Sequence, residues 1–423
     1  MQKNNYLSSY AWVVWIIAAT FYAYEFFIRV SPSVMVPNLM RSFNVDAETL
    51  GILSASYYYA YAIMQVPVGV ILDRFGIHKL LVLASLFVAG GSFLFANTDN
   101  LIIANLARVL MGIGSAFSFV GCLKLAANWF SIKQFSTVVG LTNTVGILGA
   151  ISAQAPLATA VIYYGWRHTM FFVGIAGIVI AFLILLIIRD NPPISYLPKR
   201  TSNIKRLGMG LLTVLRCHQS WLIAVFGCLL VAPVSGFTEL WSIPFLMKAH
   251  HISRPFAGML SSIMFIGIAV GGPTHSTFSN IIGKRKPILI VGAIGALLCF
   301  SAVIYLAISN IIILVSLLFL FGFFTSSMLL CFTIAAEINP KWATGAAIGF
   351  TNMLVMTGGT IFQPLIGHIL DILGRTLYNG HFVTHFTTSN YRIALSLLPI
   401  CLITALILLF FINESYDRTM SLE

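Results

Sequence analysis

Charged side chains are scarce in this sequence. Only 9% of its residues are Asp, Glu, Lys or Arg, whereas 59% are hydrophobic and the mean hydropathy is +0.94. A soluble domain carries about a quarter charged residues and about half apolar ones. The shortage of charge therefore excludes a soluble globular protein and indicates an integral membrane protein.

Acidic residues are the rarer of the two kinds of charge. The chain has 12 Asp and Glu against 24 Lys and Arg, which gives a formal net charge of +12. In a soluble protein such an excess would indicate a nucleic-acid partner. In a membrane protein Lys and Arg instead mark the cytoplasmic loops. We therefore expect a lipid bilayer, and no nucleic acid, around this chain.

Cysteine is sparse as well. Five of the six cysteines lie within apolar blocks and Cys217 lies just before one, so their spacing fits neither a disulfide framework nor a zinc site. His381 and His385 stand four residues apart in a late polar segment. Two histidines without a third ligand are a weak metal signal. We expect no metal and no cofactor.

Long polar stretches are few, and a series of apolar blocks fills the chain. Each block is about 20 residues or longer, enough to cross about 30 Å of hydrocarbon as a helix. Alternating strands of about 10 residues, the mark of an outer-membrane barrel, are absent. The sequence thus predicts an all-α integral membrane protein with twelve transmembrane helices. The expected spans are residues 10–37, 48–72, 79–97, 101–127, 136–163, 168–189, 220–247, 255–281, 287–308, 311–336, 344–370 and 392–412.

The basic residues set the expected orientation. Most Lys and Arg fall in the tails and in every second loop, which predicts that both termini are cytoplasmic, in a bacterial inner membrane. The longest polar segment is basic and lies between spans six and seven. We therefore expect an N-terminal six-helix half at residues 1–190, a cytoplasmic basic linker at 191–219 and a C-terminal six-helix half at 220–423.

The two halves repeat each other weakly. The Gly-Leu-Thr-Asn sequence that ends at Asn143 recurs as Gly-Phe-Thr-Asn ending at Asn352, and at the same offset Gln154 matches Gln363. Two six-helix halves of one topology are the building plan of many alternating-access transporters. The repeat predicts two six-helix pseudo-repeats around a central site.

The turn between spans two and three carries a recognisable motif, Gly69-x-x-x-Asp73-Arg74-x-Gly76. Gly69 permits close helix approach, Gly76 permits a tight turn, and the two charges can interact with neighbouring helix ends. The motif resembles the signature loop of the major facilitator superfamily. The resemblance implies the twelve-helix major facilitator fold, a small-molecule substrate, a monomer, and a gating role for these four residues at the cytoplasmic side.

The corresponding turn in the second half reads Asn280-Ile-Ile-Gly283 and lacks both charges, so we expect an asymmetric latch. In span four, Arg108-x-x-x-Gly112-x-Gly114 resembles the second signature of the superfamily. An intramembrane Arg needs a partner or a wet cavity. Proton coupling or substrate contact and a structural ion pair remain alternatives for it. Span five lacks the Gly-Pro run of drug/proton antiporters, which disfavours export.

A narrower resemblance rests on three stretches. They read YxxExxxRxxPS at residues 22–33, YAYxxMQxPxG at 59–69 and FVGCLKLA at 119–126. Together they resemble the proteobacterial intraphagosomal nutrient transporters, which take up amino acids and nucleosides, and the related lysosomal dipeptide uniporters. The resemblance implies uptake of a small nutrient of amino-acid type.

The acid and base of span one are the first candidates for contact with a substrate. Glu25 and Arg29 stand four residues apart and share a helix face with Tyr22. Such a pair can meet both ends of a zwitterion, or it can merely neutralise itself. Polar and aromatic residues of other spans complete the predicted site. The candidate substrate-binding residues are Tyr22, Glu25, Arg29, Tyr58, Tyr61, Gln65, Asn143, Gln154, Glu239, Trp241, Asn352 and Gln363.

Intramembrane acids are the candidates for moving a proton. Glu25 and Glu239 occupy roughly corresponding places in the two halves, and with Arg108 they are the predicted proton-coupling residues. Lys124 and Glu337, at span ends, are expected to pair with loop charges. The proton is the expected coupling ion.

The sequence therefore predicts a transporter, and no enzyme, that imports an amino acid or short peptide by proton symport. Nucleoside or organic-anion uptake is the first alternative, and efflux of a metabolite, siderophore or drug by proton antiport is the second. A non-transporting sensor or a membrane enzyme on the same scaffold is the alternative of another class.

Overall fold

The structure is a computed structural model that describes residues 2–191, 204–378, 381–384 and 386–415. The side chains of residues 2–8, 132–133, 136, 204–207, 376–378 and 381–384 are also outside the description, so the histidines at 381 and 385 cannot be placed against each other. Helices make up nearly all of the described chain, as the apolar blocks predict.

The first half contains eight helical elements. They are α1 Gln2–Val30, α2 Pro32–Phe43, α3 Ala47–Met64, α4 Val68–Phe75, α5 Ile77–Asn97, α6 Leu101–Trp129, α7 Ile132–Ser152 and α8 Ala155–Ile187.

The linker and the second half contain longer and shorter helices and one hairpin. They are α9 Ile204–Arg216, α10 His218–Pro233, the π-helix η1 Val234–Trp241, α11 Ser242–His250, α12 Arg254–Ile282, α13 Lys286–Tyr305, α14 Ile311–Thr325, the 3₁₀ turn η2 Ser326–Met328, α15 Leu329–Ile338, η3 Lys341–Ala343, α16 Thr344–Gly374, β1 Arg375–Tyr378, β2 His381–Thr384, α17 Thr388–Leu395 and α18 Leu397–Leu408.

The predicted number of crossings agrees with these elements. Ten helical segments of the described chain are individually long and apolar enough to cross a membrane. One of them, Thr137–Ile187, turns back at Gly165, whose φ of 76° only glycine adopts readily, and so makes two crossings. The pair α3 and α4 supplies one more. The twelve-helix prediction is confirmed.

Several crossings are built from two or three helices because the sequence interrupts them. Pro32 starts α2 directly after α1, and Pro67 precedes α4. Pro233 precedes the π-helix of span seven. Proline lacks the N–H that continues a helix and clashes with the preceding turn. The break between α7 and α8 at Gln154 was not predicted, although Pro156 stands in the first turn of α8.

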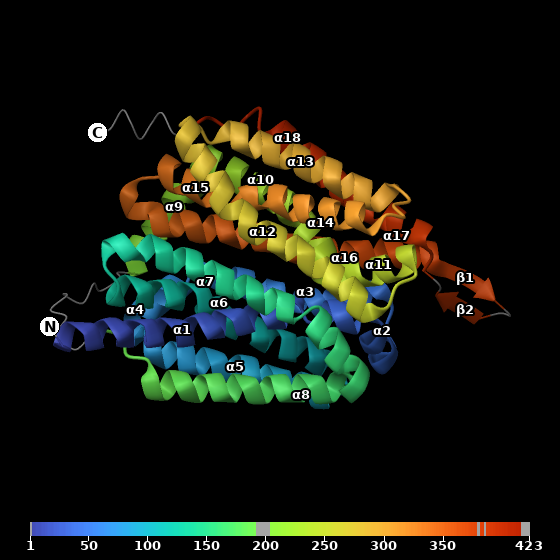
Figure 1. The fold of residues 1–423 in the computed structure, drawn as a ribbon, viewed down its shortest axis with the longest axis horizontal. Coiled ribbons are helices and arrows are strands. Elements are labelled where there is room, and N and C mark those ends of the chain that lie inside the picture. The colour runs from blue at the N-terminus through green and yellow to red at the C-terminus, as the bar shows by residue number, and fades with distance from the viewer. Residues whose placement is uncertain (1, 192–203, 379–380, 385, 416–423) are drawn as a thin grey trace.

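The helices form two layers that are stacked along their long axes (Figure 1). Elements α1 to α8 lie together, and α10 to α18 lie together above them. Both ends of the described chain lie at one end of the bundle, which we call the termini end, and the β1–β2 hairpin projects from the other, the hairpin end. The exact boundaries at residues 190 and 220 stay predictions.

The two layers meet along α3 and α16, which run side by side. Small residues permit this contact. A Cβ on Gly51 would lie 2.5 Å from the Cα of Pro364, and a Cβ on Gly359 would lie 2.7 Å from the ring of Tyr58. Glycines at these positions let two membrane helices approach closely.

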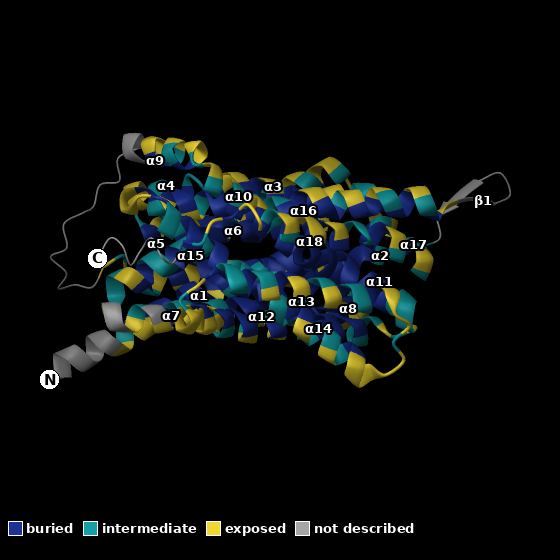
Figure 2. Ribbon diagram, turned by 90° about the horizontal axis from the view of Figure 1, so that it is seen from above, coloured by how far each residue is buried: buried dark blue, intermediate teal, exposed yellow. Residues whose placement is uncertain are grey.

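The linker and the late loop differ from expectation. The linker contains the amphipathic helix α9, which packs against α16, buries Val214 and leaves Met209 and Leu212 exposed (Figure 2). The loop before span twelve contains the antiparallel strands β1 and β2. Neither element was predicted, and neither changes the helical bundle.

Candidate functional site

Glu25 and Arg29 form a buried ion pair inside α1. The Arg29 Nε donates to Glu25 Oε1 at 2.9 Å, and Nη2 donates to the same oxygen. Glu25 is fully buried and Arg29 is 4% exposed. The i, i+4 spacing places both on one helix face, as predicted. The other oxygen, Glu25 Oε2, is buried without a hydrogen-bond partner in the described chain.

Aromatic rings surround this pair. The Tyr57 hydroxyl donates to Glu25 Oε1 at 2.7 Å. The Arg29 Cζ lies 4.1 Å from the ring centroid of Phe26 and 5.3 Å from that of Tyr61. Rings at these distances attract the guanidinium through their negative faces. Tyr57 was missed by the sequence analysis, although its spacing of four from Tyr61 was a usable signal.

A second carboxylate reaches this cluster from the other half. Glu239 lies on the π-helix η1, is 5% exposed, and accepts a hydrogen bond from the Tyr58 hydroxyl of α3. π-Helical turns often occur at functional sites. Glu239 and Tyr58, both predicted as substrate-binding residues, thus meet across the interface between the two halves.

Two further contacts cross between the halves nearby. Asn352 Nδ2 donates to Gln65 Oε1 at 2.8 Å. Arg29 Nη1 lies 3.9 Å from the sulfur of Met356, one turn along α16 from Asn352. Met356 was not predicted, because a methionine in an apolar span gives no signal of its own. The structure thus joins predicted residues of spans one, two, seven and eleven.

Other predicted residues have different surroundings. Trp241 Nε1 donates to the backbone oxygen of Gln363 at 3.1 Å, and Gln363 Nε2 donates to the backbone oxygen of Ser235 at 2.8 Å. These bonds fasten η1 to α16 within the C-terminal half. Whether Trp241 or Gln363 also meets a substrate stays a prediction.

The remaining predicted residues lie on α1 and on span five. Tyr22 packs against Phe26 at a centroid distance of 5.1 Å and against Phe119 at 4.9 Å. Gln154 is fully buried, and neither atom of its amide has a hydrogen-bond partner in the described chain. Asn143 is half-buried on α7. Their roles stay predictions.

Arg108 is held by carbonyl groups and a ring. It is 1% exposed, and Nη1 donates to the carbonyl of Ile28 at 3.1 Å. Nη2 donates to the carbonyl of Ser54 at 3.4 Å, and Cζ lies 5.0 Å from the centroid of Tyr57. No carboxylate pairs with Arg108 among the described residues. A structural ion pair thus has no partner among the described residues, and the role of Arg108 stays a prediction.

The signature turn of the first half is tied to its own half. Lys124 of α6 pairs with Asp73 and donates to the Gly69 carbonyl at 2.7 Å, as expected for a span-end lysine. Gly76 has a φ of 90°, and a Cβ there would lie 2.8 Å from a carboxylate oxygen of Asp190. Arg74 is exposed and lies 5.4 Å from the ring of Phe75.

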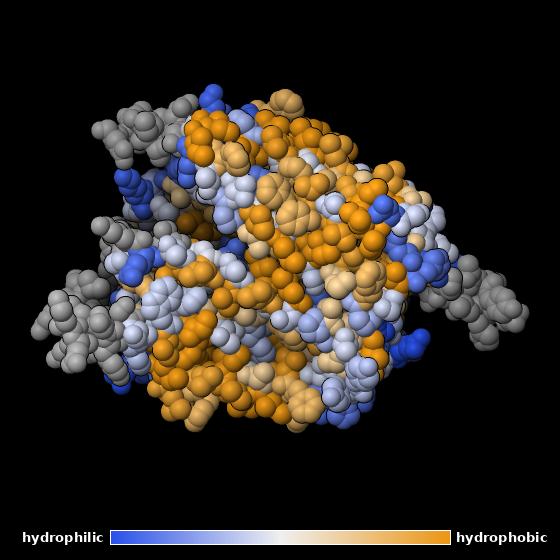
Figure 3. All heavy atoms as spheres, in the orientation of Figure 1, coloured by the Kyte–Doolittle hydropathy of each residue, from blue (hydrophilic) through white to orange (hydrophobic). Residues whose placement is uncertain are grey.

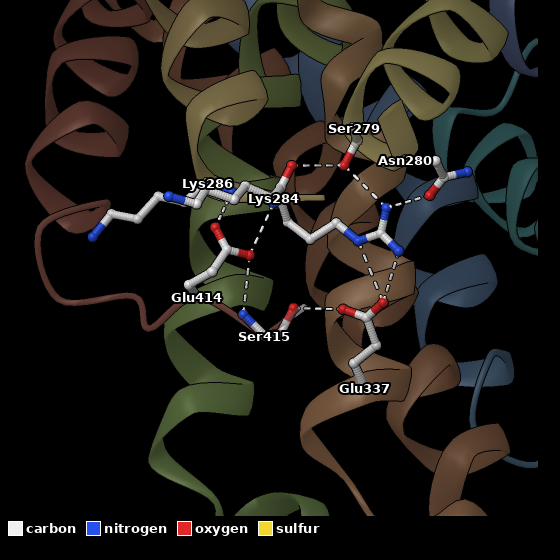
Figure 4. Close-up of polar contacts among 8 residues, drawn as sticks. Ser279, Asn280, Lys284, Lys286, Glu337, Glu414 and Ser415 are labelled. Atoms are coloured by element: carbon white, nitrogen blue, oxygen red, sulfur yellow. Dashed lines mark hydrogen bonds and ion pairs between the residues drawn. The ribbon is translucent and has the colours of Figure 1, made fainter. Parts of the chain in front are cut away.

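In the second half the ion pair is formed by Arg285, which follows the uncharged turn Asn280–Gly283, and the asymmetry of the latch stays a prediction. Arg285 donates to Glu337 of α15 at 2.9 Å and to the side chains of Ser279 at 3.0 Å and Asn280 at 2.6 Å (Figure 4). The acid is on the turn in the first half and on the neighbouring helix in the second. The ion pairs at the two turns thus have opposite polarity.

Each half also has a carboxylate that caps the helix after its turn. Asp190, just after α8, accepts from the backbone N–H of His78 at the start of α5, at 2.6 Å. Glu414, after α18, accepts from the backbone N–H groups of Arg285 at 2.8 Å and Lys286 at 3.0 Å at the start of α13 (Figure 4). A carboxylate at a helix N-terminus satisfies donors that have no partner within the helix. Each half thereby fixes its own turn.

The halves are parted at the termini end. The surface is hollowed between the two layers there (Figure 3). A separate cavity of about 350 Å³ lies at the hairpin end of the C-terminal half, near His250 and Arg392. None of the predicted site residues lines that cavity. The buried cluster between the layers, rather than that cavity, is the candidate site.

These features define a membrane transporter of two pseudo-repeated halves with a charged central site. The model of the Major Facilitator Superfamily matches residues 14–243 and again residues 225–420. The chain therefore belongs to the Major Facilitator Superfamily.

Similar proteins differ in what their names say they do. The membrane sensor protein UhpC of Escherichia coli is 23% identical, over 94% of this chain and 91% of that protein. The probable galactarate/D-glucarate transporter GudP of Escherichia coli is 23% identical, over 87% and 89%. A probable hexose phosphate transport protein of Chlamydia pneumoniae is 24% identical, over 89% and 88%.

Solved structures share the fold. A bacterial homologue of the human lysosomal transporter Spinster, in an inward-facing and unoccupied conformation, superposes with a TM-score of 0.75 at 15% identity, over 97% of this chain and 98% of that one. The nucleoside transporter NupG gives a TM-score of 0.75 at 13% identity, over 96% and 99%. The likeness is one of fold alone.

Proposed function

We propose that the protein imports a small zwitterionic nutrient, an amino acid or a short peptide, by alternating access together with a proton. The observation that supports this best is the convergence of one guanidinium and two carboxylates in the buried cluster. Arg29 and Glu25 come from the N-terminal half, and Glu239 comes from the C-terminal half.

A zwitterion suits these groups. Its carboxylate would take hydrogen bonds from Arg29, whose Nη1 has, among the described residues, only the weak acceptor Met356. Its ammonium would meet Glu25 Oε2, which has no partner in the described chain, or Glu239. A buried polar group without a partner costs free energy, and a ligand that supplies one gains affinity.

The two carboxylates are also the proposed proton carriers. Glu25 is held by Arg29 and Tyr57, whereas Glu239 is held by Tyr58 from the opposite half. Protonating Glu239 would remove the charge that strengthens the Tyr58 bond. Proton binding would thereby be linked to the contact between the halves, as symport requires. Arg108 would tune Glu25 through Tyr57, which it faces.

We place the termini end on the cytoplasmic side of a bacterial inner membrane and the hairpin end on the external side. The basic residues of the loops at the termini end support this orientation. The hollow at that end then corresponds to an inward-facing conformation. The signature turns with Asp73 and Arg285 would act as cytoplasmic gates.

Uptake of an organic anion is the second candidate. The names of GudP, of the hexuronate transporter of Escherichia coli and of the hexose phosphate transport protein favour it. An anion would use Arg29 in the same way and leave Glu25 paired with Tyr57 alone. The name of UhpC raises the further alternative of a sensor.

One experiment separates these functions. Purified protein is screened by thermal shift against amino acids, dipeptides, nucleosides, sugar acids and hexose phosphates, and each hit is tested for uptake into proteoliposomes at two pH gradients. Accumulation of an amino acid or dipeptide that increases with an inward proton gradient supports the proposal. Accumulation of a sugar acid or hexose phosphate instead supports the second candidate. Binding without any uptake would favour a sensor and contradict import.

A further inference from the structure

Asp371 of α16 caps a helix of the opposite half. Its side chain lies near the hairpin end and is 3% exposed. One carboxylate oxygen accepts from the backbone N–H of Ala47 at 3.0 Å, and the other accepts from that of Glu48 at 2.7 Å. These are the first two residues of α3. The first N–H groups of a helix lack partners within it and carry partial positive charge.

The cap of α3 is shared between two acids. Asp46, the residue before α3, accepts from the N–H of Thr49 at 3.0 Å. The N–H groups of Ala47 and Glu48 are thereby left for Asp371. The guanidinium of Arg375 lies 3.8 Å from the carboxylate of Asp46. The two N–H groups at the start of α3 are the hydrogen-bond partners of the buried Asp371 carboxylate. A buried charge persists only when such partners compensate its desolvation.

Close packing surrounds the cap. A Cβ on Gly367, one turn before Asp371, would overlap the carbonyl of Ala47. His368 Nδ1 and Glu48 Oε2 share a hydrogen bond of 2.6 Å at the exposed edge of the same contact. Every contact in this group joins α16 to α3. The whole group therefore exists only while the two halves touch at the hairpin end.

We propose that Asp371 is the latch of the hairpin-end gate. Its carboxylate holds the start of α3 against α16 while this end is closed. When the halves part here, the carboxylate and the two N–H groups exchange their hydrogen bonds for bonds to water. The proposal rests on the alternating access proposed above, and it assigns the closing contact to one acid.

The acid has no counterpart on the other side, where Arg254 at the start of α12 donates to Asn38 of α2 at 2.7 Å. At the repeat offset that matches Asn143 with Asn352, the position of Asp371 corresponds to Ile162 in the first half. The helix that corresponds to α3 is α12, and Ser253 before it makes no side-chain cap. The contact of α12 with α7 and α8 instead relies on shape, since a Cβ on Gly258 would lie 2.9 Å from the backbone nitrogen of Ala155.

Hydrogen exchange measured by mass spectrometry on the full chain in lipid nanodiscs tests the latch without any substrate. Asp371→Ala is compared with wild type at residues 47–53, at residues 254–260 and at residues 341–352. The first two segments lie at the hairpin end in different helices, and the third lies at the termini end. Exchange reports the opening equilibrium of each segment.

A latch makes the two ends respond in opposite directions. Loss of a side-chain cap shifts such an equilibrium by about tenfold. We expect exchange to be about tenfold faster in both hairpin-end segments of Asp371→Ala, and slower at residues 341–352, because the population moves to the state closed at the termini end. A change confined to the first turn of α3, or no change, would show an ordinary cap and overturn the latch.

Two further variants complete the test of the latch. Asp371→Asn keeps the shape and one acceptor oxygen, so it should give a smaller shift in the same directions, and it is decisive if Asp371→Ala does not fold. Asp99→Asn is the matched control, since Asp99 pairs with Arg167 within one half at the same end. Its exchange should equal that of wild type at all three segments. Because no substrate is added, failure to find a transported compound leaves this result intact, and failure of the latch leaves the proposed import intact.

Discussion

The Tyr58 hydroxyl, on α3 of the N-terminal half, donates a hydrogen bond to the Glu239 carboxylate on the π-helix of the C-terminal half. Both groups are buried. Buried hydrogen bonds to a charged group contribute about 1.5–3 kcal/mol. This bond is therefore strong enough to bias which conformation of a two-state transporter is populated.

Tyr58→Phe removes this hydroxyl and keeps the ring. We expect the ratio of inward-open to outward-open protein to fall by roughly 30-fold, which corresponds to about 2 kcal/mol. Distance measurements between spin labels on the two halves would report it. Tyr59→Phe is the matched control, because the Tyr59 hydroxyl makes a longer, half-exposed bond of 3.2 Å to the carbonyl of Thr360. Equal effects of the two substitutions would contradict a special role of the Tyr58 bond.

Glu25→Gln keeps the shape of the side chain and removes its charge. If Glu25 carries the proton, uptake driven by a pH gradient should fall to the equilibrium level, whereas exchange of labelled for unlabelled substrate should continue. Proteoliposomes loaded with substrate measure both. Accumulation as in wild type would rule out Glu25 as a carrier.

Arg29→Ala should destabilise the protein by about 3–5 kcal/mol, because it leaves Glu25 buried without its cation. The double variant Glu25→Ala with Arg29→Ala should recover most of this loss, as judged by thermal unfolding in detergent. Arg29→Lys keeps the charge but loses the two-pronged contact. We expect it to raise the KM for a carboxylate-bearing substrate by about tenfold or more, and an unchanged KM would reduce the pair to mutual neutralisation.

Asp73→Asn removes the acid of the signature turn. We expect slower transport with unchanged binding, because Asp73 acts in the gate and not in the central site. Lys124→Gln breaks the same ion pair from the other side and serves as the comparison. If the pair alone matters, the two variants slow transport equally. If Asp73 also stabilises the closed cytoplasmic gate, Asp73→Asn transports more slowly than Lys124→Gln. Loss of substrate binding in either variant would contradict a gating role.

Gly51→Ala adds a methyl group where a Cβ would lie 2.5 Å from the Cα of Pro364. Because backbone cannot yield cheaply, the hairpin end should open, with hydrogen exchange in residues 47–53 several-fold faster. Gly90→Ala is the control, since nothing lies within 4 Å of its added methyl group. Alanine in a helix is better than glycine by roughly 0.5–1 kcal/mol, so this control should unfold at the same temperature as wild type or slightly higher.

Much of the fold could be predicted from the length of the apolar runs. Runs of about 20 apolar residues must become helices in a bilayer, because every backbone N–H and C=O there needs a partner within its own segment. The repeat that matches Asn143 with Asn352 then predicted two related halves, and the Asp73 turn indicated the superfamily. The break at Gln154 was missed, although Pro156 in the first turn of the next helix was a usable signal.

The central site was predicted only in part. The pairing of Glu25 with Arg29 is local, since four residues span one helical turn. Tyr58 and Glu239 are 181 residues apart in the sequence, and only the packing of α3 against the second half brings them together. Residues of ordinary type, such as Met356 beside Arg29, become visible only in that packing.

The sequence by itself determined that this chain spans a membrane many times, that it consists of two related halves, and that an acid and a base share the face of its first helix. These properties depend on composition and on spacing along one helix. The tertiary structure decided which half each charge serves: Asp73 and Arg285 pair within their own halves, whereas Glu239 and Asp371 reach across. Contacts between distant segments depend on how helices pack, and no local pattern encodes that.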